Sequence, residues 1–352
     1  MGNYDEMALA VEMLSGGKNR VLLDDVGLPG VYVVIPKGTN AVLNGGDGSV
    51  VHPAFKVNSV EKEEILISKY QNYVYNNRAY SLPGRMPKTS VNQNQSKTYC
   101  TNKGKGFHLM TIAEWAYIAL WCKKNGTMPH GNNNYGKDYN YPYETGVGIG
   151  SKDGSNRTQW VAPGSGPVTW AHDHTNAGIY DLNGNIWEWQ DGLRLVDGEI
   201  QIIANNDAAQ GADCDTGADS TLWKAILPDG SLVTPGTSGS LKYDWVSSKI
   251  QLTDTVTAPT AGGQGCQYKD MTLKSELNVP DIIKMLILYP AQPGSDVYGG
   301  DYHYMNPEGE RLPICGGVWD GTSGAGVFCV SLRFPRSLAN GSIGFRSAFV
   351  DL

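Results

Sequence analysis

Thiols are the side chains of this sequence with the widest chemistry, because a thiolate can act as a nucleophile or bind a soft metal ion. The six cysteines are scattered along the chain, and no two of them form a Cys-x-x-Cys pair. They are Cys100, Cys122, Cys214, Cys266, Cys315 and Cys329. Without a paired spacing, we expect free, buried thiols that pack as small apolar side chains.

A second group with possible chemistry is His172, Asp173 and His174. In a β-strand alternate side chains share a face, so the two imidazoles could bind one transition-metal ion. A third ligand is not evident in the sequence, and histidines beside an aspartate are common in loops. The sequence leaves a metal site and an ordinary loop as alternatives here.

The composition limits which functions the rest of the chain can have. Only 18% of the 352 residues are charged, whereas glycine (44), tyrosine (19) and tryptophan (9) are abundant, as in a loop-rich protein with short strands. The net charge of -7 and the lack of a basic cluster disfavour nucleic-acid binding. We expect neither a signal peptide nor membrane insertion, so a role outside the cell would require export as part of a particle.

Helices and strands that could position such residues are predicted from periodicity and capping signals. Thr111 and Glu114 form a capping box before an apolar helical face, which predicts a helix over 112–123. Further helices are expected over 4–14 and 280–289. Strands are expected over 31–35, 64–70, 178–182, 199–203, 249–252, 327–334 and 344–350. Residues 125–165 read as a long surface loop, and 204–270 as an inserted or peripheral segment.

The C-terminal segment combines a rigid frame with replaceable side chains. Gly316, Gly317 and Trp319 open it, Gly344–Arg346 close it, and small or mixed residues lie between. A fixed frame that carries variable side chains suggests a binding surface more than a reaction centre.

Alternation within this segment predicts which side chains face outward. Phe328, Val330, Leu332 and Phe334 share one apolar face of the expected strand, whereas Ser331 and Arg333 lie on the other. We therefore expect Ser331 and Arg333 to be exposed.

Four segments, in order, resemble the formylglycine-generating-enzyme-like branch of the C-type lectin fold. They are 64–70, 106–117, 180–189 and 344–346, and the Gly-Asn-Ile-Trp-Glu-Trp run at 184–189 is the most specific of them. The resemblance implies an α+β protein with short antiparallel strands, few helices and long loops.

Within that branch, residues 315–352 resemble the variable region of the variable proteins of diversity-generating retroelements. The resemblance implies that the positions that diversify and bind ligand are Val318, Asp320, Gly321, Gly324, Ser331, Arg333, Phe334, Leu338, Asn340 and Ser342. It also implies that Gly317, Trp319, Gly344 and Arg346 are scaffold, and we expect Trp187 and Trp189 to be core struts of the fold signature.

The enzymes of this branch use two thiols five residues apart before the terminal Gly-Phe-Arg. The matching positions here fall near Ser323 and Phe328, and Cys329 is one position away without a partner. Thiolate chemistry needs the sulfur atoms, so we expect no catalysis of this kind. An oxidase of this type remains the alternative function, together with a lectin of fixed specificity for glycans.

In relatives, the segment that matches 183–188 binds calcium. The resemblance therefore implies a calcium site at Asn183, Glu188 and the main-chain carbonyls of Gly184 and Ile186, since calcium prefers hard oxygen ligands. The alternative is that Asn183 and Gly184 form a tight turn and that Glu188 is a buried hydrogen-bond partner.

These observations together predict a non-catalytic ligand-binding protein. Residues 1–60 are expected to serve attachment or oligomerisation, and 61–352 to form the lectin-like domain, with an insertion at about 193–300 and the variable region at 315–346. The expected ligand is a protein or glycan of a host cell surface. The expected setting is a phage tail tip in the virion, with a bacterial cell surface as the alternative, and a homotrimer would add avidity. No cofactor is expected to be required beyond a structural calcium ion.

Overall fold

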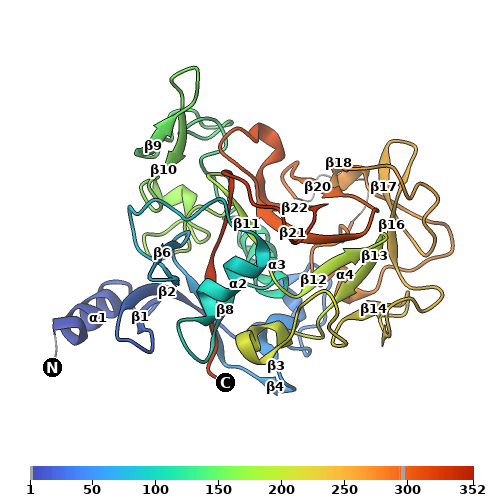
Figure 1. The fold of residues 1–352 in the computed structure, drawn as a ribbon, viewed down its shortest axis with the longest axis horizontal. Coiled ribbons are helices and arrows are strands. Elements are labelled where there is room, and N and C mark those ends of the chain that lie inside the picture. Colours follow the sequence, from blue (N-terminus) through green and yellow to red (C-terminus); the bar gives the residue numbers. More distant parts are fainter. Residues whose placement is uncertain (1–2, 293, 295–297) are drawn as a thin grey trace.

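The computed structural model describes residues 3–292, 294 and 298–352, and its helices are short (Figure 1). They are α1 (Asn3–Leu14), α2 (Gln93–Thr101), α3 (Ile112–Asn125) and α4 (Asp281–Met285). None of the helices in these ranges is long and apolar enough to cross a membrane.

A five-stranded sheet joins the two ends of the chain. Its order is β1-β2-β5-β24-β8, so the last strand lies between strands from the first third of the sequence (Figure 1). The strands are β1 (Asn19–Leu23), β2 (Pro29–Pro36), β5 (Glu64–Ser68), β24 (Ser347–Phe349) and β8 (Phe107–Leu109). Since β2 pairs with β5, the expected boundary at residue 60 falls within one sheet. The attachment role of residues 1–60 stays a prediction.

The second, thirteen-stranded sheet carries the variable region. Its main path is β18-β20-β22-β21-β12-β13-β16-β17-β19, with β11, β14, β15 and β23 attached at the side. The strands are β11 (Trp187–Trp189), β12 (Leu193–Val196), β13 (Glu199–Ile202), β14 (Lys224–Ile226), β15 (Leu232–Val233), β16 (Lys242–Val246), β17 (Lys249–Thr253), β18 (Gln264–Gln267), β19 (Thr272–Leu273), β20 (Tyr302–Met305), β21 (Glu310–Gly316), β22 (Gly326–Phe334) and β23 (Ile343–Phe345). Much of the segment expected to be an insertion is thus part of the sheet that supports β22.

Three two-stranded sheets complete the architecture. They are β3 (Lys56–Val57) with β4 (Val60–Glu61), β6 (Tyr73–Tyr75) with β7 (Arg78–Tyr80), and β9 (Gly148–Lys152) with β10 (Thr158–Val161). The last pair projects at the top of Figure 1 and adds a hairpin to the surface loop expected over 125–165.

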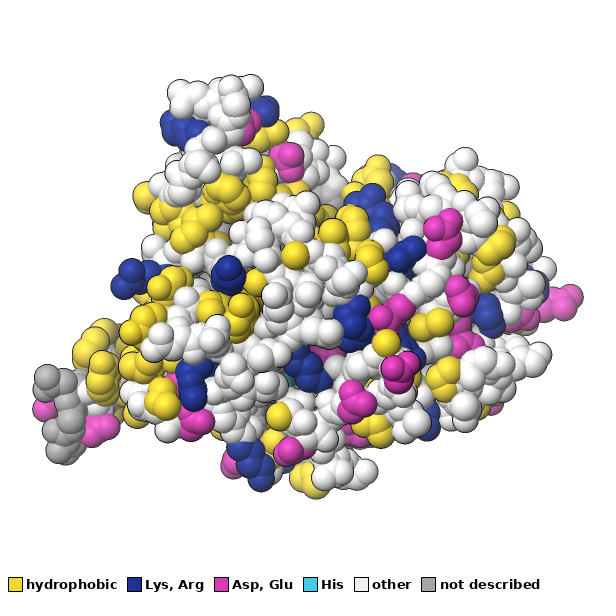
Figure 2. Space-filling view, in the orientation of Figure 1, with side chains coloured by type: hydrophobic (Ala, Val, Ile, Leu, Met, Phe, Trp, Pro, Cys, Tyr) yellow, Lys and Arg dark blue, Asp and Glu magenta, His cyan; other side chains and the backbone are white. Residues whose placement is uncertain are grey.

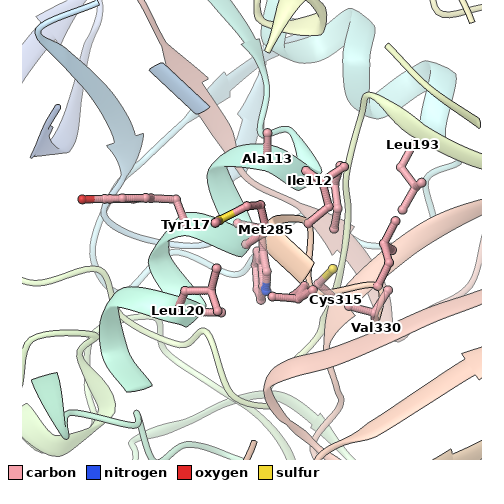
Figure 3. Packing of buried hydrophobic residues seen from close by; sticks show 14 of the residues in the cluster. Ile112, Ala113, Tyr117, Leu120, Leu193, Met285, Cys315 and Val330 are labelled. Carbon is pink, nitrogen blue, oxygen red and sulfur yellow. The ribbon is translucent and has the colours of Figure 1, made fainter. Parts of the chain in front are cut away.

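Helix α3 forms the centre of the main apolar core. Thr111 and Glu114 make the predicted capping box, and Gly126 ends the helix in the left-handed conformation. The side chains of Ile112, Tyr117 and Leu120 pack among residues from both sheets and α4 (Figure 3). The Trp115 indole N–H donates to the Val327 carbonyl at 2.7 Å, which ties the helix directly to β22.

Two expected strands differ from the structure. Residues 178–182 form only an isolated bridge between Ala171 and Tyr180, because Asp181 has a positive φ that interrupts an extended chain. The expected strand over 344–350 is two strands, β23 and β24, which belong to different sheets and are separated by Arg346.

Candidate functional site: an aromatic patch beside the variable region

Arg346 joins the two sheets beneath the variable region. Its side chain is fully buried, and its Nε and Nη2 donate to the two carboxylate oxygens of Glu188 at 2.9 and 2.8 Å. Nη1 donates to the Ser68 carbonyl at 2.9 Å, and Nη2 also donates to the Tyr180 carbonyl at 2.9 Å. The buried guanidinium of Arg346 and the buried carboxylate of Glu188 are thus paired in charge and hydrogen-bonded. This geometry agrees with the expected scaffold role of Arg346.

Two of the expected scaffold glycines have no room for a side chain. Gly317 has a φ of +89°, and a Cβ there would lie 2.4 Å from the Cβ of Ala325. A Cβ at Gly344 would lie 2.4 Å from the Lys88 carbonyl oxygen. Sterics therefore require glycine at both positions.

The expected scaffold tryptophans differ in their surroundings. Trp319 is 8% exposed and packs edge-on against Trp160. Trp189 is fully buried and donates its indole N–H to the Val91 carbonyl. Trp187 is half-buried: it packs against the apolar cluster that contains Trp189 and Phe345, as expected of a core strut, and it also meets Tyr304 edge-on at the surface.

An aromatic patch surrounds Tyr304 on the outer face of β20 and β22; we define it as Trp187, Tyr302, Tyr304, Arg333 and Phe334. Tyr302 and Tyr304 stack with their ring centroids 5.6 Å apart, and the Arg333 guanidinium lies 4.3 Å from the Tyr304 centroid. All five side chains are partly exposed. Burial raises the pKa of the Tyr304 hydroxyl well above its ordinary value, so this group remains a hydrogen-bond donor.

The segments expected to diversify approach this patch from two sides. A Cβ at Gly324 would lie 3.3 Å from the Tyr304 hydroxyl, which places the loop between β21 and β22 beside the ring. On the other side, the Trp187 amide donates to the Ser342 carbonyl, and Leu338 packs against the same apolar cluster as Phe334. In Figure 1 the loop between β21 and β22, in orange-red, stands between the β9–β10 hairpin and β18.

Nine of the ten expected binding positions reach the surface. Asp320 and Asn340 are exposed, and the half-buried positions are Val318, Gly321, Gly324, Arg333, Phe334, Leu338 and Ser342. The exception is Ser331, which is 0% exposed, with a buried hydroxyl that has no hydrogen-bond partner among the described residues. The predicted exposure of Ser331 is wrong, because Ser331 pairs with Tyr304 on one side and Ile314 on the other within the sheet.

The sequence reasoning missed Tyr302 and Tyr304. Both belong to β20, whose alternate residues His303 and Met305 are fully buried. The alternation Tyr-His-Tyr-Met was the available signal, but nothing in the sequence indicates that β20 runs parallel beside β22.

The residues expected to bind calcium do not fit that ion. Both carboxylate oxygens of Glu188 accept hydrogen bonds from the Arg346 guanidinium, and Gln71 donates to one of them at 3.0 Å. The Ile186 carbonyl also accepts from Gln71, and the Asn183 side-chain oxygen accepts from Asn133. A divalent cation beside a guanidinium would be repelled, so the arrangement favours the alternative, a buried hydrogen-bond partner.

The histidines around Asp173 have partners other than a metal. His172 accepts a hydrogen bond at Nδ1 from the Ile179 amide, and burial lowers its pKa to about 4. His174 has a positive φ, so the two imidazoles do not alternate along a strand. Within residues 3–292, 294 and 298–352, no group of three or more His, Cys, Asp or Glu side chains could hold a metal ion.

The cysteines are free and buried, as predicted. Burial raises the pKa of Cys315 and of Cys329 well above the ordinary thiol value, which keeps both protonated. The two positions that matched the enzymes' thiols are Ser323 and Phe328, and neither side chain contains sulfur. Ser323 is exposed in a short turn (η6, Thr322–Gly324), whereas Phe328 is fully buried.

A polar cavity of about 240 Å³ adjoins the loop between β21 and β22. Thr322, Ser323 and Val327 line it from the variable region, and Asn133 and Asp138 from the loop after α3. The Asp138 carboxylate accepts hydrogen bonds from the amides of Gly131, Asn140 and Tyr141, so its oxygens are used to shape that loop.

Comparisons with known proteins agree with this architecture. Residues 54–202 match the family model of the sulfatase-modifying factor enzyme 1-like domain. The inactive C-alpha-formylglycine-generating enzyme 2 of Mus musculus is 30% identical over 104 residues, which cover 30% of this chain and 31% of that relative. The chain thus matches about a third of the length of that protein.

Two solved structures are similar over most of the chain. PvdO from Pseudomonas aeruginosa is 16% identical, with 94% of this chain and 97% of that chain covered and a TM-score of 0.34. Treponema denticola variable protein 1 is 14% identical, with 94% and 98% covered and a TM-score of 0.32. The family match over residues 54–202, together with the mixed sheets and few helices, agrees with an α+β chain in the formylglycine-generating-enzyme-like form of the C-type lectin fold.

Proposed function

We propose that this protein is a non-catalytic ligand-binding protein whose C-terminal variable region, 315–346, forms the binding surface. One observation carries the proposal: positions far apart in that region gather around the aromatic patch, while the frame beneath them is buried. Arg333 and Phe334 belong to the patch, and Gly324 and Ser342 adjoin it. A few aromatic and arginine side chains on a stiff platform are the usual carriers of binding energy.

The same geometry explains how specificity could change without loss of the fold. At the nine positions that reach the surface, substitution usually changes stability by about 0.5 kcal/mol or less, whereas Ser331 is buried. Glycine at 317 and 344 and arginine at 346 are held by sterics and a buried ion pair. Diversification would therefore alter the surface and leave the platform unchanged.

The absence of sulfur at positions 323 and 328 supports a role without thiol catalysis. Figure 2 shows Lys and Arg side chains scattered among Asp and Glu on the face drawn, without one broad basic field of the kind that nucleic acids require. We propose that the partner is a protein or glycan of a host cell surface, that the protein acts at a phage tail tip in the virion, and that a homotrimer supplies avidity. A bacterial cell surface is the second setting.

The test is binding of the fluorescently labelled protein to a panel of bacterial strains. We expect wild type to label some strains and the double variant Arg333→Ala, Phe334→Ala to lose that labelling while its melting temperature stays within a few degrees. The control variant Arg85→Ala, Tyr75→Ala removes another exposed arginine and exposed aromatic and should label as wild type does. Equal labelling by both double variants would contradict the proposal.

A further inference from the structure

Arg333 differs from the other arginines of the chain in its partners. Of the nine arginines, seven form ion pairs with Asp or Glu: Arg20, Arg78, Arg157, Arg194, Arg311, Arg336 and Arg346. Arg85 forms none with the described residues, but it is exposed and water can solvate it. Arg333 is thus the one half-buried arginine without a carboxylate partner in the part of the chain that the structure describes.

Aromatic rings, rather than acids, hold the Arg333 side chain. Its guanidinium lies 4.3 Å from the Tyr304 ring centroid and 5.4 Å from that of Phe334. Its stem passes Gly263, where a Cβ would lie 3.1 Å from the arginine Cδ. The rings orient the charge, and cation–π attraction offsets part of its desolvation.

The guanidinium of Arg333 donates no hydrogen bond to any of the described residues. Nε is buried and has no hydrogen-bond partner among the described residues. A guanidinium carries five N–H donors in a fixed fork, and a buried donor without a partner costs about 1–3 kcal/mol. The two Nη atoms are not buried in this way, so an oxyanion of a ligand can receive hydrogen bonds from them.

We infer that Arg333 receives the carboxylate of an acidic sugar, whose ring lies against the neighbouring aromatic side chains Trp187 and Tyr302. The inference rests on the proposed function and names the ligand class of that same surface. The planar guanidinium can donate two hydrogen bonds, one to each carboxylate oxygen. Trp187 and Tyr302 each contact Tyr304, the ring that carries the guanidinium, and remain partly exposed, so they offer apolar surface to the sugar.

The number of charges favours one carboxylate over a polyanion. Recognition of acidic peptide motifs uses clusters of arginines. The nearest candidate for a second cation in the variable region is Arg336, but Glu310 holds its guanidinium at 2.7 and 3.0 Å. Among the described residues of the variable region, Arg333 is the one cation without a carboxylate partner, and the net charge of the protein is -7, so a ligand with one charge and apolar faces fits better than a polyanion.

The experiment titrates three small probes into the intact protein and follows binding by ligand-observed NMR. The probes are glucuronate, its neutral methyl ester, and a dipeptide of glutamate and glycine. We expect saturable glucuronate binding, and binding roughly ten- to hundredfold weaker for the ester, because only the charged group forms the charge-assisted bonds. Arg333→Gln should lower glucuronate affinity by the same factor, and the control Arg85→Gln should leave it unchanged.

Each other outcome overturns the inference. Equal affinity for glucuronate and its ester would remove the role of the charge. Tighter binding of the dipeptide would replace the sugar by an acidic peptide. No glucuronate binding, or unchanged binding by Arg333→Gln, would show that Arg333 does not receive such a group. Labelling of cells that is lost in the Arg333, Phe334 double variant would keep the proposed function in each of these cases.

Discussion

Glu188 belongs to the fold signature, and its contacts favour the second of the two roles expected for it, a buried hydrogen-bond partner. The resemblance placed it in a calcium site, whereas the structure pairs it with Arg346, 158 positions away. The pair explains why both residues belong to the fold signature, since each neutralises the other at a point where two sheets meet.

Replacing Glu188 by glutamine should destabilise the fold strongly. Glu188→Gln leaves the Arg346 charge buried without a carboxylate, which we expect to cost about 3–5 kcal/mol of unfolding free energy. Urea unfolding measures this loss. The control Glu64→Gln breaks the solvent-accessible pair with Arg20 and should cost less than about 1 kcal/mol. Similar losses in both variants, or a wild-type stability that falls when calcium is chelated, would contradict the assignment.

At the scale of elements, a helix could be predicted where its signals lie close together in the sequence. The capping box at Thr111 and the apolar face behind it are local, and α3 was predicted correctly. Helix α2 was missed, although Asn92 and Gln95 form a second capping box, because its buried positions include Gln93 and Ser96. A helix that buries polar residues shows no apolar periodicity.

Long-range pairing explains the errors at the C-terminus. Residues 344–350 alternate as one strand would, but Arg346 divides them between two sheets. Helix α4 ends at Met285 rather than near residue 289, and Ile287 has a positive φ that a helix cannot include. No sequence pattern specifies these pairings, because they depend on strands more than a hundred residues away.

Strand β22 is buried on both faces over most of its length, which makes Ser331 a sensitive position. Its hydroxyl is buried and unpartnered among the described residues. Ser331→Ala should therefore be neutral or stabilise by up to about 1 kcal/mol, because a desolvated hydroxyl is removed. Ser331→Leu should overpack the strand and cost about 1–3 kcal/mol. Thermal unfolding of both variants tests this, and a large loss in Ser331→Ala would show that the hydroxyl has a partner.

On the scale of the whole molecule, buried titratable groups give the stability a dependence on pH. Burial lowers the pKa of His52 to about 3 and that of His303 to about 3. A neutral buried histidine binds no proton between its folded pKa and the unfolded value near 6.5, so stability falls as pH falls through this window. Asp181 acts in the opposite sense, since burial raises its pKa to about 7.

The His52→Asn variant separates one histidine from these opposing contributions. Asparagine can keep the N-cap of the turn η2 (Pro53–Phe55), where His52 accepts from the Ala54 amide. We subtract the unfolding free energy of the variant from that of wild type. As the pH is lowered from 6 to 4.5, this difference should decrease by about 1.4 kcal/mol for each pH unit. A difference that is constant over this range would show that His52 becomes protonated in the folded state.

The molecule as a whole combines a buried frame, two sheets that Arg346 joins, and a surface around Tyr304 whose side chains can vary. The sequence predicted the frame and most of the exposed positions. It did not predict that β20 would bring Tyr302 and Tyr304 beside them, because their strand is parallel to β22 and joined to it through a long connection.

The measurement that tests the central claim most directly is sequencing of this gene and its neighbourhood across closely related genomes. We expect substitutions to concentrate at the codons of Val318, Asp320, Gly321, Gly324, Ser331, Arg333, Phe334, Leu338, Asn340 and Ser342, with Gly317, Trp319, Gly344 and Arg346 unchanged. A near-copy of the segment and a reverse transcriptase gene should lie nearby. A segment 315–346 that does not vary, without such neighbours, would contradict a diversified binding surface.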